Sequence, residues 1–287
     1  MINYKITLEY DGSRYNGWQR QGNTDNTIQG KLEALLSRYF GQDIEIHGSG
    51  RTDAGVHALG QVANFKVDYK NNTASSNIDS EDTTALRNAI NGFLPEDIRI
   101  TSMSIADNRF HARLNAKSKL YRYRICLSDT NKRSVFDRKY CAILTEPASY
   151  SKCETASKPK FGTKSISKSV SCLDLDIDAM KSASTSFLGE HDFGAFSDTK
   201  TKKSTVRYVE SITFSTEKTA TDTYLVVDFK GNGFLYHTVR LMMGTLIRIG
   251  QGECSADIID KIFATNNRKL VPFTAPAEGL FLVEVEY

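Results

Sequence analysis

This chain of 287 residues shows no strong compositional bias, and the sequence features that it lacks exclude several classes of protein. The five cysteines form no Cys-x-x-Cys pair, so we expect neither a disulfide framework nor a zinc site. No apolar run approaches the length of a membrane-spanning helix, and a strand pattern begins directly at Ile2, so we expect neither a membrane anchor nor a signal peptide. A reduced, cytoplasmic protein fits these features.

Net charge is also modest, at +3, and identifies no polyanionic partner by itself. Its distribution is uneven, because 14 Lys and Arg stand against 4 Asp and Glu between Arg113 and Lys168. A local basic surface attracts phosphate groups. A solvated surface loop has the same composition, so charge alone leaves both interpretations open.

Hydrophobic spacing predicts a β-α-β-β-α-β order in the first half, which is the signature of a ferredoxin-like unit. The expected elements are a strand at 2–10, a helix at 28–40, strands at 44–46 and 63–67, a polar loop at 70–82, a helix at 86–93 and a strand at 98–102. Asn26 or Thr27 can cap the first helix, and Gly41 can end it.

A similar order recurs in the second half. Its expected elements are a strand at 120–126, a helix at 177–189, strands at 206–214 and 224–229, a strongly apolar helix at about 234–249, a short helix capped by Ser255 and a strand at 280–287. We therefore predict an α/β (α+β) protein of two ferredoxin-like halves, 1–108 and 109–287, whose antiparallel sheets form a central cleft. The second half carries a Lys/Ser-rich insert at about 129–170, to which we assign no chemistry.

The glycine-rich segment Gly48–Ala58 follows a predicted strand and has residues suited to a site. Glycine allows a sharp turn and a close approach to a ligand. Arg51 and Asp53 are two residues apart, so in an extended stretch they point to the same side. A surface ion pair that staples a turn is the alternative. His57 can serve as a general base, although we favour a structural hydrogen bond for it.

Aromatic and basic residues alternate at 119–125. In a strand, Tyr121 and Tyr123 share one face, while Arg122 and Arg124 share the other. This arrangement suits nucleic acid, because rings stack on bases and cations contact phosphates. An ordinary amphipathic strand with half-buried tyrosines explains the same pattern, so it remains an alternative.

Arg240 is a cation in a helix that is apolar nearly all round, which predicts that the helix is buried. A buried guanidinium needs an anionic partner, because an unpaired buried charge is very costly. Asp53 is the candidate partner. The alternative is an arginine at the helix margin that pairs with a different, structural acid.

The nine residues Gly-Arg-Thr-Asp-Ala-Gly-Val-His-Ala (50–58) resemble the active-site motif of the tRNA pseudouridine synthase A family. The resemblance continues in order at residues 10–21, 119–125, 189–196, 233–240 and 275–280. Lys119 stands where the family more usually has arginine. The resemblance covers almost the whole chain except the loop at 70–82 and the insert at 129–170.

The resemblance implies a role for several residues. Asp53 would be the catalytic carboxylate, with Tyr121 against the target base and Arg240 paired with the carboxylate. Arg51 and Leu280, the latter at an apolar position of the family's site, would complete the substrate-binding residues. The further candidate RNA contacts are Arg207, Arg122 and His57.

The resemblance also implies the reaction, which converts uridine to pseudouridine at positions 38, 39 and 40 in the anticodon arm of tRNA. It further implies that the enzyme is a homodimer. Moving a base from nitrogen to carbon attachment includes no redox or phosphoryl-transfer step, so we expect no cofactor and no metal. Burial raises the pKa of an Asp, ordinarily about 3.9, and a nearby arginine lowers it, so the chemistry needs a cation beside Asp53. Whether the carboxylate attacks the sugar, adds to the base or removes a sugar proton stays open.

Three other functions compete with this one. A non-catalytic RNA-binding protein of two ferredoxin-like modules would normally carry an aromatic-rich Lys/Arg-Gly-Phe strand, and none occurs here in full. A hydrolase built on Asp53 and His57 would need a second acid or a metal, for which the sequence offers no strong candidate. An enzyme of the same family that acts on a different RNA position is the third.

Overall fold

The computed structural model describes residues 1–69, 80–128, 134–144, 175–198 and 204–287. Most of the predicted loop at 70–82 and of the insert at 129–170 therefore lies outside the described residues. The first half contains β1 (Ile2–Tyr10), α1 (Ile28–Phe40), β2 (Ile46–Gly48), β3 (His57–Val67), α2 (Thr83–Asn91) and β4 (Ile98–Ala106). The second half contains β5 (Ser118–Cys126), α3 (Ile177–Ser184), β6 (Gly189–Asp192), β7 (Val206–Lys218), β8 (Thr223–Gly231), α4 (Thr238–Gly250), α5 (Ile258–Thr265) and β9 (Leu280–Glu286).

The described strands form one nine-stranded sheet, which confirms a mixed α/β protein. The strand order is β4-β1-β3-β9-β5-β8-β7-β6, and the short β2 pairs with β3 outside this path. Every neighbouring pair is antiparallel except β3 and β9. Those two strands pair in parallel through His57–Phe281 and Ala58–Leu282.

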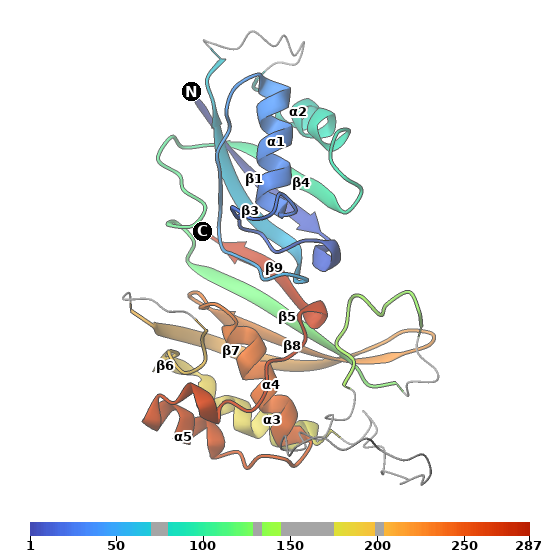
Figure 1. The fold of residues 1–287 in the computed structure, drawn as a ribbon, viewed down its shortest axis with the longest axis vertical. Coiled ribbons are helices and arrows are strands. Elements are labelled where there is room, and N and C mark those ends of the chain that lie inside the picture. The colour runs from blue at the N-terminus through green and yellow to red at the C-terminus, as the bar shows by residue number, and fades with distance from the viewer. Residues whose placement is uncertain (70–79, 129–133, 145–174, 199–203) are drawn as a thin grey trace, which may run out of the picture.

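The last strand of the chain joins the two halves. In Figure 1, β9 lies between β3 of the first half and β5 of the second, although β3 and β9 are far apart in sequence. Helices α1 and α2 lie beside the N-terminal strands, and α3, α4 and α5 lie beside the C-terminal strands. Among the described residues, no helix has the length and apolar character needed to cross a membrane.

Local sequence explains where α1 begins and ends. The side chain of Thr27 accepts a hydrogen bond from the backbone N–H of Gly30, as expected for an N-cap. Gly41 follows the helix with a φ of 64°, a left-handed conformation that glycine adopts without strain. The buried residues of α1 include Ile28, Leu32 and Leu36, and they belong to the main hydrophobic core.

Some predicted boundaries were wrong, for identifiable reasons. Strand β3 begins at His57 and not near Ala63, because it is buried on both faces and the polar–apolar alternation is lost. Helix α4 begins only at Thr238, because His237 has a φ of 66° and cannot continue a right-handed helix. The helix predicted at 177–189 ends at Ser184, and Gly189 begins a strand that was not predicted.

The short helix after residue 255 is present as α5, but Ser255 is not its cap. Asp257 occupies the N-cap position, and its side chain makes no capping hydrogen bond. The carbonyl of Ser255 accepts a hydrogen bond from the backbone N–H of Ile258 instead. The chain therefore turns once before the helix starts, which moves the beginning of α5 towards the C-terminus.

Candidate active site

A cavity of about 620 Å³ is lined by segments from both halves of the chain. Residues 50–54 form one side, and residues 234–240 form another. Tyr121 and Leu280 also line it, so the residues that the sequence assigns to catalysis and base binding meet in one place.

The loop that carries Asp53 connects β2 to β3 and is held by the segment before α1. The backbone N–H of Trp18 donates to the carbonyl of Thr52 at 3.0 Å, and the Thr52 hydroxyl bonds that of Tyr10 at 2.8 Å. Gly17 lies so close that a Cβ there would stand 2.6 Å from the Thr52 oxygen. The end of β1 at Tyr10 and the loop that contains Gly17 and Trp18 therefore fix the backbone position of the Asp53 loop.

Two cationic or potentially cationic groups face the same oxygen of Asp53. Nη1 of Arg240 lies 3.4 Å from Oδ2, and Nε2 of His237 lies 3.6 Å from it. Arg240 is itself held by a 2.7 Å hydrogen bond from Nε to the carbonyl of Ala275. The side chains of Asp53 and Arg240 are only 13% and 16% exposed. The predicted pairing of the buried arginine with Asp53 is thus present in the structure.

Electrostatics at Asp53 combine opposing effects. Burial raises the pKa of the carboxyl above its usual range, and the charges of His237 and Arg240 act against that rise. Without these neighbours, the buried carboxyl would hold its proton more strongly still. The two partners therefore favour the ionised form of a carboxyl that is mostly buried.

Tyr121 and Leu280 supply the apolar walls. The ring of Tyr121 is buried and packs edge-on against Phe234, with centroids 5.4 Å apart. Burial raises the pKa of its hydroxyl, so the ring stays neutral. Leu280 is the first residue of β9 and is also buried. Tyr123, on the same strand as Tyr121, donates instead to the carbonyl of Pro276 at 2.8 Å.

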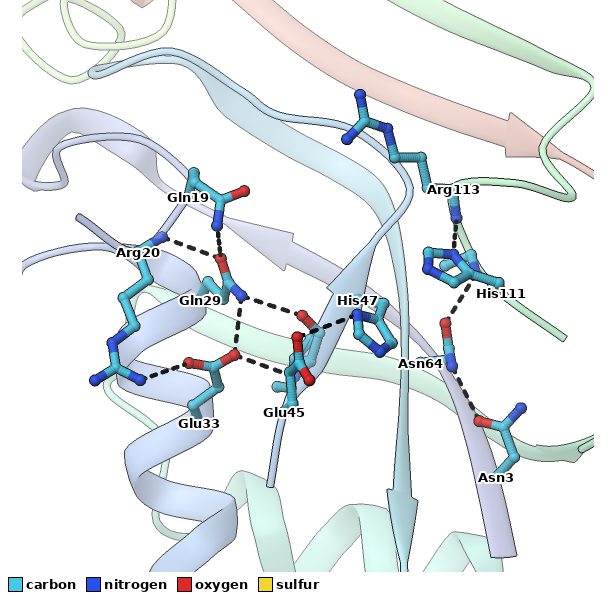
Figure 2. A network of polar contacts seen from close by, with 12 residues as sticks. Asn3, Gln19, Arg20, Gln29, Glu33, Glu45, His47, Asn64, His111 and Arg113 are labelled. Atoms are coloured by element: carbon cyan, nitrogen blue, oxygen red, sulfur yellow. Dashed lines mark hydrogen bonds and ion pairs between the residues drawn. The ribbon is translucent and has the colours of Figure 1, made fainter. Parts of the chain in front are cut away.

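Arg51 lines the cavity but does not pair with Asp53, contrary to the ion-pair alternative. Its Nε donates to Oε1 of Gln19 at 3.1 Å. Figure 2 shows how Gln19 is held, because its amide donates to Gln29 at 2.7 Å and Gln29 donates to Glu33 at 2.9 Å. Gln29 and Glu33 belong to α1, so the helix positions the partner of Arg51 and leaves the rest of this exposed guanidinium near the cavity.

Further cations line another part of the cavity, namely Arg113, Lys119 and Arg207. Nζ of Lys119 donates to the carbonyl of Ser49 at 2.8 Å. Burial lowers the pKa of Lys119 to about 8, and the charges of Arg113 and Arg207 add to that effect. Arg207 also donates to the carbonyls of Ser204 and Val206. Such a cluster of positive charge is suited to phosphate groups.

Comparison with known proteins agrees with this geometry. A family model described as tRNA pseudouridine synthase matches residues 6–115 and 183–287. The chain belongs to the tRNA pseudouridine synthase family. It is 41% identical over 292 residues to tRNA pseudouridine synthase A of Bacillus sp. (strain KSM-64), with all of both chains covered. It is 38% identical to tRNA pseudouridine synthase A 2 of Bacillus cereus (strain ZK / E33L) and 36% identical to tRNA pseudouridine synthase A of Acetivibrio thermocellus, again over all of each chain.

Two of the candidate RNA contacts, His57 and Arg122, line a different cavity from Asp53. His57 is buried and lines a second cavity, where Nδ1 accepts a hydrogen bond from Gly12 and Nε2 donates to the carbonyl of Lys139. Burial lowers the pKa of His57, which favours the neutral ring that these bonds require. Arg122 lines the same second cavity and pairs with Asp228 at 2.9 Å. The structure therefore does not assemble the Asp53–His57 pair that a hydrolase would use.

Sequence reasoning missed two residues of the site, His237 and Asp198. His237 directly precedes α4 and stands three positions before Arg240, so its nearness in the sequence to that candidate was a usable signal. Asp198 had none, because its contact with His237 depends on how distant segments meet. In the part of the chain that the structure describes, no group of His, Cys, Asp or Glu has an arrangement that could hold a metal ion.

Proposed function

We propose that this protein isomerises uridine to pseudouridine in tRNA and that Asp53 is its single catalytic carboxylate. One observation carries the proposal: among the described residues that line the cavity, Asp53 is the only acidic side chain. The cations Arg51, Arg113, Lys119 and Arg207 line the same cavity. One carboxylate in a basic, partly apolar cavity suits a reaction on an uncharged base whose neighbouring phosphates are anionic.

The contacts of Asp53 suit such a role. Arg240 and His237 both approach Oδ2, and Oδ1 has no hydrogen-bond or ion-pair partner among the described residues. Oδ1 is therefore the oxygen available to the nucleoside. Moving a base out of its stack costs a few kcal/mol, and stacking on an aromatic ring returns about 1–3 kcal/mol per base. We assign that stacking to Tyr121, with Leu280 beside it.

We further propose that the two halves, 1–108 and 109–287, are each a ferredoxin-like unit and that RNA lies in the cleft between them. The strand orders β4-β1-β3-β2 and β9-β5-β8-β7 support this, since neighbours within each order are antiparallel and helices follow the first and the third strand of each half. The second half has one additional helix, α5, after α4. A ferredoxin-like unit has its fourth strand beside its first, and both orders agree with that. In the second half, the short strand β6 pairs with the outer side of β7 as an addition to this pattern.

The target positions 38, 39 and 40 and the homodimer remain proposals that rest on the family resemblance, and the cytoplasmic location remains a proposal that rests on the composition of the sequence. For positions 38 to 40 the test is direct. Unmodified tRNA is incubated with the protein, and pseudouridine is mapped at each position. Pseudouridine confined to other positions would replace this target assignment while leaving the reaction unchanged.

The central experiment compares the wild type with Asp53→Ala. We expect Asp53→Ala to form no pseudouridine while it still binds tRNA, because the cavity keeps its cations. Pseudouridine formation by Asp53→Ala would disprove the role of the carboxylate. Loss of tRNA binding in this variant would favour a binding role for Asp53 over a chemical one.

A further inference from the structure

A series of ionisable side chains connects Asp53 to Arg268 in the second half. Nε2 of His237 lies 3.6 Å from Oδ2 of Asp53, and its Nδ1 lies 2.7 Å from Oδ2 of Asp198. The other oxygen of Asp198 accepts a 2.9 Å hydrogen bond from Nε of Arg268. His237 therefore stands between two carboxylates, one in the cavity and one outside it.

The backbone around His237 is arranged to aim the ring. His237 has a φ of 66°, a left-handed conformation that few non-glycine residues adopt and that is found preferentially at functional sites. The carbonyl of Tyr236 accepts hydrogen bonds from the backbone N–H of Asp198 and the hydroxyl of Ser197. The ring of Tyr236 stacks on that of His237, with centroids 3.7 Å apart. Segment 197–198 thus holds both the backbone and the ring.

The two carboxylates decide which form of the ring fits. Nδ1 donates to Asp198, so a neutral ring would turn the lone pair of Nε2 towards the negative oxygen of Asp53. A ring with protons on both nitrogens is attracted to both carboxylates. Among the described residues, the further charged or titratable groups that contact these three side chains are Arg240, which pairs with Asp53, Arg268, which pairs with Asp198, and Tyr236, whose ring stacks on that of His237.

We propose that His237 is a positively charged positioning residue, oriented by Asp198, that shares Oδ2 of Asp53 with Arg240 and leaves Oδ1 to the nucleoside. This inference rests on the proposed function, since it concerns the same carboxylate. Arg240 and His237 both approach the same oxygen of Asp53. The second oxygen is thereby presented in a single orientation.

The activity test uses Asp198→Asn, which keeps a hydrogen-bond acceptor for Nδ1 and removes the charge. Pseudouridine formation is measured in single turnover at saturating tRNA across pH, with tRNA affinity measured separately. We expect the rate of Asp198→Asn to fall about tenfold at neutral pH, with tRNA affinity unchanged, and the alkaline limb of its profile to move to lower pH. His237→Gln should be slower still and should lack this limb. Asp178→Asn, which changes an exposed carboxylate that pairs with Lys181 on the same helix, serves as the control.

A second readout needs no tRNA. Long-range proton–nitrogen NMR spectra of the imidazole rings report which ring nitrogens carry protons, and His237→Gln assigns the signal among the five histidines. We expect both ring nitrogens of His237 to carry protons in the wild type, because a carboxylate faces each of them, and this form to be less favoured in Asp198→Asn. A neutral His237 ring in the wild type would overturn the proposal.

The outcomes separate the two claims. A wild type that forms no pseudouridine in tRNA counts against the proposed function. The NMR spectra still decide whether His237 is doubly protonated, because they need no tRNA. An active wild type with an Asp198→Asn variant of unchanged rate and pH profile overturns the inference only. Equal losses of rate and tRNA affinity in Asp198→Asn would assign Asp198 a structural role and would also overturn it.

Discussion

Replacing Arg240 with methionine tests whether the guanidinium keeps Asp53 ionised. Burial raises the pKa of Asp53, and Arg240 and His237 act against the rise. An acid carries its charge above its pKa and loses it below. Removing one of the two partners raises the pKa of Asp53 further, so Arg240→Met should lose activity at an acidic pH where the wild type is still active.

The distance gives the size of the effect. Unit charges 3.4 Å apart attract each other by about 5 kcal/mol at an effective dielectric constant of about 20, and the desolvation of Arg240 offsets part of this. A neighbouring arginine typically lowers the pKa of an Asp by about 1–3 units. We therefore expect the midpoint of the acidic limb to move up by about 1–3 pH units in Arg240→Met.

The assay is single-turnover pseudouridine formation at saturating tRNA from acidic to neutral pH. Arg240→Lys keeps the charge and should move the limb less than Arg240→Met. Arg248→Met is the matched control, because Arg248 lies in the same helix, has a similarly buried side chain (15% exposed) and pairs with Glu253 outside the cavity. A uniformly slower Arg240→Met with an unmoved acidic limb would refute the reasoning, since Arg240 would then act on the substrate and not on the carboxylate.

Two further predictions concern the cavity wall and the fold. Lys119 has a pKa of about 8, so it is charged below that pH and neutral above it. Wild-type tRNA affinity should fall as pH rises through about 8, whereas Lys119→Arg should show no such fall; equal profiles in filter binding would contradict this. In Gly12→Ala, a Cβ would stand 1.9 Å from the carbonyl oxygen of Val56, and we expect about 1–3 kcal/mol less stability in urea unfolding. Gly22→Ala, with nothing within 4 Å of its Cβ, should be neutral, and equal stability of both variants would count against the close contact.

Local patterns in the sequence were sufficient to predict the bounds of some helices and strands and not of others. Strand β1 and helix α1 follow from periodicity and capping, because those signals depend on neighbouring residues. The full length of β3 did not follow, because burial on both of its faces comes from packing that the sequence does not display. The late start of α4 came from the left-handed backbone of His237, a conformation that the apolar periodicity of residues 234–249 does not display.

The candidate site divides in the same way. Asp53 was recognised within nine contiguous residues, and the need of Arg240 for an acid followed from the cost of burying a charge. Only the tertiary structure decided that Arg51 donates a hydrogen bond to Gln19 and that His57 lines another cavity. It also decided that His237 lies between Asp53 and Asp198. The physical reason is distance along the chain. Asp53 and Arg240 are 187 residues apart, and their meeting depends on β9 pairing between the two halves, which no local propensity specifies.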